Sequence, residues 1–129
     1  MLRIIDIQVS GTAAGEWIVL QNQGMQPVNL RGWVLAGDRY LSGDPSTAAS
    51  QMFIFTVDQL IKPGARVVLL SIHGKDGWYA TVEGGSAFIA YANRSESLWS
   101  HADELHLLQP VSARRIHPEQ ILQVVEREA

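Results

Sequence analysis

Residues 16–35 constrain the fold of this chain more than any other segment. They contain two short apolar runs, each with a tryptophan, and a glycine lies between the runs. Ile18 and Leu20 alternate with the residues between them, which is the period-two pattern of a β-strand with one buried face. Gly24 suits a turn, because a positive φ costs glycine little. The segment therefore predicts a strand, a tight turn and a second strand within a β-rich domain.

The side chains around this turn have structural interpretations. A buried indole removes on the order of 150–250 Å² from water, so we expect Trp17 and Trp33 to serve packing, with stacking on a ligand as the alternative. Asn22 stands two residues before Gly24. Its amide is of the type that hydrogen-bonds nearby backbone and so stabilises a turn.

Further short strands follow along the chain. They are predicted over residues 5–9, 52–55, 67–70, 78–82, 88–91, 105–108 and 113–116. In the first of these, Ile5, Ile7 and Val9 alternate with polar residues and are expected on one half-buried face. Many short strands with turn signals between them, and almost no helical periodicity, indicate a β-sandwich or barrel.

Paired turn residues separate several of these strands. Pro63 and Gly64 are the residues that a type II turn prefers at its two central positions. Gly84 and Gly85 are expected to connect the strands over 78–82 and 88–91 as a small hairpin.

Composition excludes several classes of function. The chain has 129 residues and no cysteine, which fits one domain and excludes zinc ribbons, thiol nucleophiles and disulfide scaffolds. Ten basic and 13 acidic residues give a net charge of -3, so we expect no nucleic-acid partner. No apolar run approaches the ~18–20 residues of a membrane span, so no membrane span is predicted. Asp6 and Gln8 interrupt the first apolar run, so we expect no signal peptide and, if the chain is full length, a cytoplasmic protein.

Three blocks of residues occur in a characteristic order. The first consists of Glu16-Trp17-Ile18, Asn22, Gly24, Pro27-Val28, Leu30 and Gly32-Trp33-Val34-Leu35. The second consists of Phe53, Phe55, Leu60, Pro63-Gly64 and Val67-Val68-Leu69. The third consists of Leu98, residues 103–108 and Pro110. Together the blocks resemble the lamin-tail domain, an immunoglobulin-like module of nuclear lamins and many bacterial proteins, over residues 3–116. The segment from Ser71 to Ser97 is longer than the family pattern.

The resemblance implies both a fold and a kind of function. It implies an all-β immunoglobulin-like sandwich of roughly seven to nine strands over residues 1–117. Residues 118–129 would be a tail or a short helix. A bacterial member of this family would be a non-enzymatic protein-interaction or scaffold module, with no catalytic residues, cofactor or metal. A carbohydrate-binding sandwich with exposed tryptophans and a small hydrolase are the alternatives.

Two clusters of chemically active side chains are candidates for a catalytic or metal site. Residues 101–106 hold His101, Asp103, Glu104 and His106, but neighbours an odd number apart on a strand point to opposite faces. This spacing argues against a metal site and against a pair of catalytic carboxylates. Ser71, His73 and Asp76 lie beside turn glycines, without the glycine-flanked serine of a nucleophile elbow. We predict a loop edge with a surface histidine at the first place and a turn at the second.

Trp78 and Tyr79 are the best candidates for contact with a partner. Exposed aromatic side chains supply a large contact area for little lost rotamer entropy. The alternative is a packed cluster with Phe88 and Tyr91. For residues 118–129, docking on the chain's own domain and pairing with a second copy, as a weak homodimer, both stay open.

Overall fold

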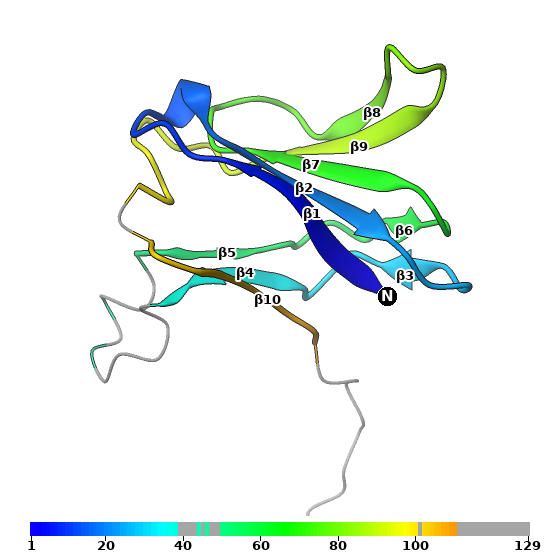
Figure 1. Cartoon of the computed structure of the whole chain (residues 1–129), viewed down its shortest axis with the longest axis horizontal. Helices are drawn as coiled ribbons and strands as arrows, with labels where there is room; N and C mark the ends of the chain where they lie inside the picture. The colour runs from blue at the N-terminus through cyan, green and yellow to red at the C-terminus, as the bar shows by residue number, and fades with distance from the viewer. Residues whose placement is uncertain (39–43, 45, 47–49, 101, 111–129) are drawn as a thin grey trace, which may run out of the picture.

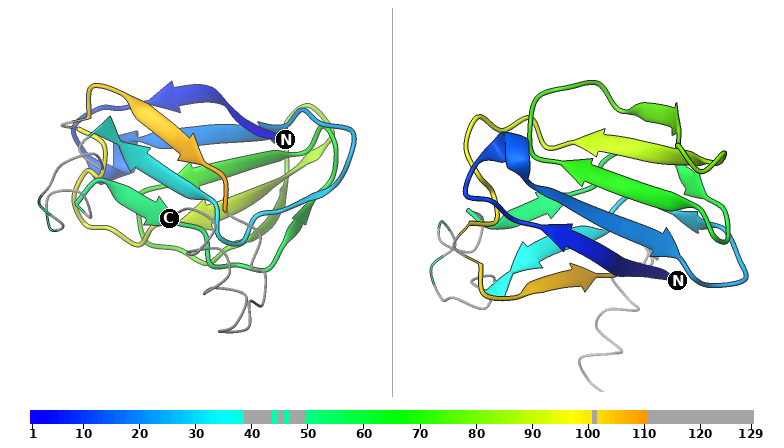
Figure 2. Two further views of the ribbon diagram at one scale, coloured as in Figure 1. Left: turned by 90° about the horizontal axis from the view of Figure 1, so that it is seen from below. Right: turned by 45° about the horizontal axis from the view of Figure 1, so that its top comes forward.

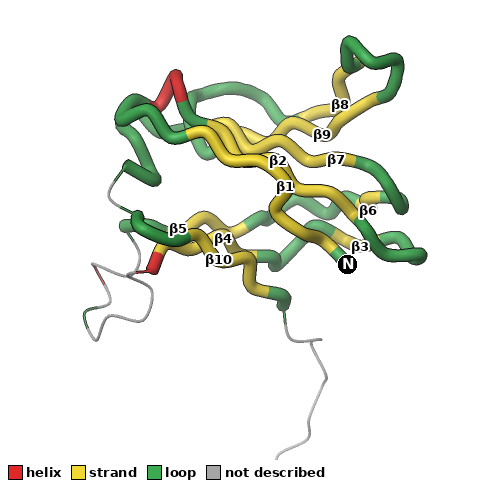
Figure 3. The backbone as a smooth tube through the Cα atoms, in the orientation of Figure 1, coloured by secondary structure: helices red, strands yellow, loops and turns green. Residues whose placement is uncertain are grey.

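The protein is a two-layered all-β domain in its computed structural model, which describes residues 1–38, 44, 46, 50–100 and 102–110 (Figure 1). This confirms the predicted all-β sandwich class, with ten described strands where roughly seven to nine are expected. The described strands are β1 (Leu2–Gln8), β2 (Trp17–Asn22), β3 (Val28–Asn29), β4 (Val34–Gly37), β5 (Met52–Ile54), β6 (Leu60–Ile61), β7 (Arg66–Leu70), β8 (Gly77–Ala80), β9 (Ser86–Tyr91) and β10 (Leu105–Leu108). Figure 3 shows these strands stacked in two layers, with loops at the ends. No helix within the described ranges is long and apolar enough to cross a membrane. The strand predicted over 113–116 and the tail 118–129 lie outside the described residues.

One layer is a five-stranded sheet in the order β1-β2-β7-β9-β8. The opposing layer contains a three-stranded sheet, β10-β4-β5, and the two-stranded pair β3-β6. The two tryptophan-bearing segments of residues 16–35 therefore lie in different layers (Figure 2). β9 lies between β7 and β8 in this sheet. It pairs parallel with β7 and antiparallel with β8.

The core lies between the layers and contains two of the four tryptophans. Trp33 is 6% exposed, as predicted, and Trp99 is 1% exposed. The prediction that Trp17 packs like Trp33 is wrong, since Trp17 is 36% exposed. It alternates with the fully buried Ile18 along β2, so its indole lies on the opposite face of the sheet.

The expected alternation in the first strand is interrupted by a β-bulge. The register with β2 shifts between Ile4 and Asp6, which leaves Ile5 as the extra residue. Ile5, Ile7 and Val9 are 38%, 43% and 42% exposed, so the prediction of one half-buried face is wrong for all three. After the bulge Ile7 lies opposite the core residue Ile18, whereas a strict period of two would place Ile7 on the same face as Ile5.

Both paired turn signals form as predicted. Gly64 has a φ of 83°, and Ala65 N donates to Lys62 O at 3.0 Å. Gly84 has a φ of 91° and lies in the connection between β8 and β9, which pair antiparallel as a hairpin. Glycine is needed at both positions because side-chain-bearing residues rarely adopt this conformation.

Asn22 is fully buried and connects four backbone groups. Its Oδ1 accepts from Gly24 N and from the amino group of Met1, both at 3.0 Å. Its Nδ2 donates to Gln26 O and Ile61 O, both at 2.8 Å. The predicted turn-stabilising role is confirmed, and the amide also ties the turn to the opposing layer.

Replacing Asn22 with aspartate is expected to destabilise the domain by about 1–3 kcal/mol, because the carboxylate places oxygen against two carbonyl oxygens. Urea unfolding measured at neutral pH checks this. Gln23→Glu, an exposed neighbour that undergoes the same amide-to-acid change, is the control. Equal unfolding midpoints for the two variants would contradict the prediction.

Candidate functional site

The outer face of the five-stranded sheet is apolar. Val67 and Leu69 of β7 are fully buried in the core, so Val68 and Leu70 point away from it. The strand registers align Trp17, Leu70 and Tyr91 in one row, and Val19, Val68 and Ile89 in the next. We define the outer face as these side chains and that of Tyr79. In a sheet with one solvent-exposed face, apolar and polar residues normally alternate along each strand. In β7, by contrast, residues 67–70 are apolar on both faces.

No described layer covers the outer face. The second layer lies on the other side of the sheet, as the turned view in Figure 2 shows. Trp17 and Tyr79 are 36% and 45% exposed, and the other five outer-face residues are half-buried. The loop between β7 and β8 reaches only one end of the face, where Gly74 lies so close to the Tyr91 ring that a side chain at position 74 would collide with it.

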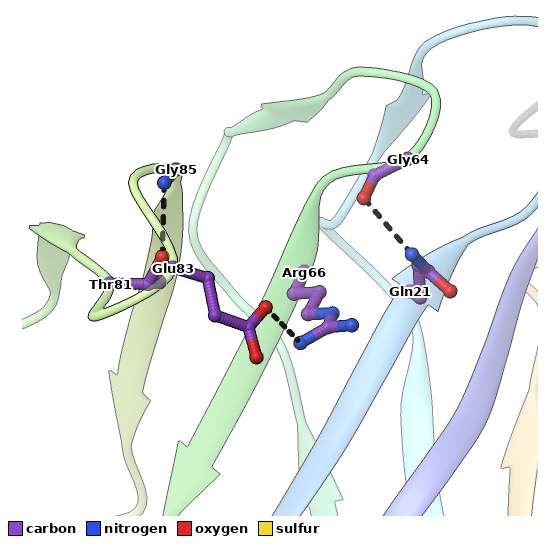
Figure 4. A network of polar contacts seen from close by, with 6 residues as sticks. All are labelled: Gln21, Gly64, Arg66, Thr81, Glu83 and Gly85. Atoms are coloured by element: carbon purple, nitrogen blue, oxygen red, sulfur yellow. Dashed lines mark hydrogen bonds and ion pairs between the residues drawn. The ribbon is translucent and has the colours of Figure 1, made fainter.

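β8, the last strand of this sheet, forms a hairpin with β9. Thr81 N donates to Gly85 O at 2.8 Å, and the Thr81 hydroxyl accepts from Gly85 N at 3.1 Å. Arg66 on β7 lies 3.8 Å from the Glu83 carboxylate at the hairpin tip (Figure 4). Nearby, Gln21 Nε2 donates to Gly64 O at 3.2 Å. β8 pairs with β9 and is the edge strand of this sheet.

Trp78 and Tyr79 point to opposite faces of that edge. The Trp78 ring packs edge-on against Phe88, with 5.5 Å between centroids, and is still 42% exposed. It also lines a hollow of about 420 Å³, here called the β8 groove. The groove is bounded by Gln59, Leu60, Lys62, Ala65, Trp78 and Ser86. Leu60 is 57% exposed, so this groove presents apolar surface to solvent.

Tyr79 belongs to the outer face and lies beside Tyr91. Its hydroxyl donates to Lys75 O at 3.2 Å. Desolvation raises the pKa of the Tyr91 phenol above 10.0, and Tyr79 and then Asp76 raise it further. The structure thus contains the predicted contacts with Phe88 and Tyr91, and it also leaves both candidate residues largely accessible. The role of Trp78 and Tyr79 in binding stays a prediction.

The candidate catalytic residues point to separate partners. Ser71 is buried and its hydroxyl donates to Glu16 Oε1 at 2.5 Å. His73 Nε2 lies 3.3 Å from the Ser95 hydroxyl. Asp76 Oδ1 accepts from Tyr91 N at 2.9 Å. These contacts are those of a structured turn.

The cluster over residues 101–106 is only partly described, since His101 lies outside the described residues. His106 Nε2 is 3.5 Å from Glu104 Oε2, and the Glu104 side chain is 72% exposed. Asp103 N donates to Asp38 Oδ1 at 3.1 Å. Across the described ranges no three histidine, cysteine or acidic side chains gather as metal ligands would.

Sequence reasoning missed a buried carboxylate. Glu16 is 1% exposed and precedes β2. Its Oε1 accepts from the Ser71 hydroxyl at 2.5 Å and from Leu98 N at 2.6 Å, and its Oε2 accepts from the Ser97 hydroxyl at 2.5 Å. All three donors are uncharged and distant in sequence, so no local pattern could have identified them. The carboxylate fastens the segment before β10 to the five-stranded sheet.

Beside this segment lies a polar hollow of about 460 Å³. It is lined by Ser50, Gln51, Arg94, Ser95, Glu96, Ser97 and Leu98. The Gln51 Oε1 atom is buried and has no hydrogen-bond partner among the described residues. None of these lining residues is a histidine, so the hollow does not supply the histidine–carboxylate pair that a hydrolase of the predicted kind requires.

The fold and these surfaces define a class of protein, an all-β sandwich domain with an apolar outer sheet face and an aromatic edge strand. Comparison with known proteins adds no narrower assignment. No protein-family model, curated protein or solved structure matches this chain.

Proposed function

We propose that the domain is a non-enzymatic protein-interaction or scaffold module, as the lamin-tail resemblance implies, and that it binds through the outer face. The observation that carries the proposal is the apolar outer face, which no described element covers. Contiguous exposed apolar surface of this kind marks interaction sites in soluble proteins. Trp17, Tyr79 and Tyr91 supply the aromatic side chains that dominate the energy of protein interfaces.

The surroundings of this face also suit a protein partner. Gln21 and Arg66 lie at its β6-proximal end, and Asp6 pairs with Val19 at its β1 border. A polar rim around an apolar centre is the usual anatomy of a protein interface. Because Arg66 is paired with Glu83, the rim carries little net charge at that corner. We therefore expect binding to weaken only modestly when salt is raised.

A carbohydrate-binding module is the second candidate, because aromatic side chains do share the outer face. Trp17 and Tyr91 lie in one row, separated by Leu70. A sugar also needs several polar groups placed to hydrogen-bond its hydroxyls, whereas this row and the next are apolar. A glycan array separates the two functions, and a specific glycan signal that is lost in Trp17→Ala would favour the carbohydrate reading.

The proposal predicts that Leu70→Lys abolishes partner binding. A charge at the centre of the outer face would have to be desolvated in any complex, so capture of the partner should fall at least tenfold. Quantitative mass spectrometry of proteins retained from a native lysate of the source organism measures this. Ile54→Lys is the matched control, because Ile54 is 50% exposed on β5 of the other layer.

Thermal unfolding of both variants separates binding from folding. We expect the two lysine variants to unfold within about 1 kcal/mol of the parent, since neither side chain lies in the core. Undiminished capture by a folded Leu70→Lys variant, or equal loss with Ile54→Lys, would contradict binding through the outer face.

A further inference from the structure

We propose that β8 binds an extended peptide segment, rich in apolar and acidic residues, as an additional antiparallel strand. This inference rests on the proposed function, since it names the class of partner at the β8 end of the same surface. Strand addition of this kind takes affinity from main-chain hydrogen bonds and specificity from pockets for alternate side chains. Both elements are present at this edge.

The backbone of β8 presents free hydrogen-bonding groups. β8 is the last strand of its sheet and pairs only with β9 among the described strands. Thr81 N donates to Gly85 O, so Thr81 and, by alternation, Tyr79 direct their backbone groups toward β9. The N–H and C=O groups of Trp78 and Ala80 then point outward. Among the described strands none pairs with these two donors and two acceptors, and their spacing is the one that an antiparallel strand matches.

Apart from its short length of four residues, this edge lacks the devices that usually protect one. Edge strands are commonly shielded by charged side chains, proline or a bulge. β8 reads Gly-Trp-Tyr-Ala and contains none of these. β1, at the opposite edge of the same sheet, has a bulge between Ile4 and Asp6 and carries Arg3. The contrast within one sheet singles out β8 as the edge open to pairing.

The side chains of β8 offer an apolar contact on each face. An added strand would direct alternate side chains to the two faces of the sheet. On the inner side they would reach the β8 groove, with Leu60, Ala65 and Trp78 in its wall. On the outer side they would lie beside Tyr79. A segment with apolar residues at consecutive positions satisfies both faces.

Two lysines near the edge select acidic residues in the same segment. Lys62 lines the β8 groove, and Lys75 lies in the loop that leads into β8. Neither lysine forms an ion pair with another described residue. The nearby Asp76 carboxylate is directed to Tyr91 N by its hydrogen bond. Acidic side chains on either side of an apolar centre would therefore find unpaired cations.

The length of β8 favours a peptide over a second copy of the chain. β8 has four residues, or about 13 Å of strand. Two such edges meeting alone would bury much less than the ~1,200 Å² of a stable dimer interface. A peptide of a partner needs only this edge and the groove, and would give the weak, transient complex typical of small interfaces.

The test uses three capped synthetic peptides and the whole chain. The acidic peptide has the sequence EEIVVTEE, the basic one is KKIVVTKK, and the third is the acidic peptide with N-methylated central residues. We expect the acidic peptide to bind with shifts in the amide NMR signals of residues 77–80 and a change in tryptophan fluorescence. The basic peptide should bind about fivefold more weakly, and the N-methylated one should lose about tenfold.

Two proline variants test the backbone contacts. Ala80→Pro removes an outward N–H while sparing the bonds to β9, and should weaken the acidic peptide about tenfold. Ile54→Pro is the matched control, because Phe55 N donates to Trp33 O and the Ile54 N–H therefore points outward from the edge strand β5. It should leave peptide binding unchanged. The double variant Lys62→Glu and Lys75→Glu should reverse the preference between acidic and basic peptides.

Several outcomes would overturn the inference. They are absence of binding by the acidic peptide at about 1 mM, equal binding of the N-methylated peptide, and unchanged binding by a folded Ala80→Pro variant. Sedimentation that shows a dimer of the parent chain, dissociated by Ala80→Pro, would assign the edge to a second copy instead. If Leu70→Lys still abolishes capture from lysate while the peptides fail, the proposed function stands and only strand addition is excluded.

Discussion

Replacing Glu16 with alanine is expected to lower the free energy of unfolding by about 3–5 kcal/mol. The substitution leaves two hydroxyls and one backbone N–H, those of Ser71, Ser97 and Leu98, without their common acceptor. These groups lie in or next to the protein interior. An unpaired donor there cannot hydrogen-bond to water, so it destabilises the folded state. Urea unfolding followed by far-ultraviolet circular dichroism measures the loss.

Two further substitutions define the cause of that loss. Glu16→Gln keeps the shape and one acceptor oxygen, and serine hydroxyls can rotate to accept from its amide, so it should cost less than alanine. Glu96→Ala removes an exposed carboxylate from the same loop and should change stability by under about 0.5 kcal/mol. Glu16→Ala with the stability of Glu96→Ala would show that the carboxylate does not hold the segment before β10.

Truncating Trp99 to alanine is expected to destabilise the domain by about 3–5 kcal/mol, the usual cost of removing a large buried aromatic side chain. Trp99 is 1% exposed and belongs to the core cluster between the layers. The same substitution at Trp17 removes an indole from the outer face and should cost about 1–2 kcal/mol. Chemical denaturation of the two variants compares their losses of unfolding free energy. Because both replace a tryptophan with alanine, the difference tests whether Trp99 lies in the core and Trp17 on the outer face.

The Trp99 indole N–H adds a second test at this position. The nitrogen is buried and finds no hydrogen-bond partner in the part of the chain that the structure describes. Trp99→Phe removes this unpaired donor together with part of the ring, so it should cost distinctly less than alanine. A larger loss from Trp17→Ala than from Trp99→Ala would reverse the placement of the two side chains.

The hairpin of β8 and β9 connects the fold to its proposed function. It lies within the segment from Ser71 to Ser97. This segment supplies Trp78, Tyr79, Ile89 and Tyr91, so it contributes to the outer face, the edge strand and the β8 groove. Much of the proposed binding surface therefore comes from this one segment.

Local sequence patterns predicted the strands well. The segments over 67–70 and 105–108 correspond to β7 and β10, and the strand through residues 16–22 corresponds to β2. The turns at Gly64 and Gly84 were also predicted, because a positive φ is a local requirement that glycine satisfies. The sequence identified Trp78 and Tyr79 as candidate contact residues because they are aromatic. It did not indicate which face of the sheet each side chain would occupy.

Non-local features escaped prediction for physical reasons. The bulge at Ile5 changes the face of later residues without changing their composition. Trp99 lies in a segment without strand periodicity, yet it is buried beside Leu98, whose N–H donates to the Glu16 carboxylate. The apolar outer face arises only when three strands from distant parts of the chain align their registers.

The amino-acid sequence by itself determined that this chain forms short strands joined by glycine turns around an apolar core, since periodicity and backbone freedom act over a few residues. Only the tertiary structure decided which apolar side chains are left outside, which strand forms an open edge and where a buried carboxylate is satisfied. Those properties depend on pairing between strands that are far apart along the chain, and the free energy of that pairing comes from contacts that no local pattern contains.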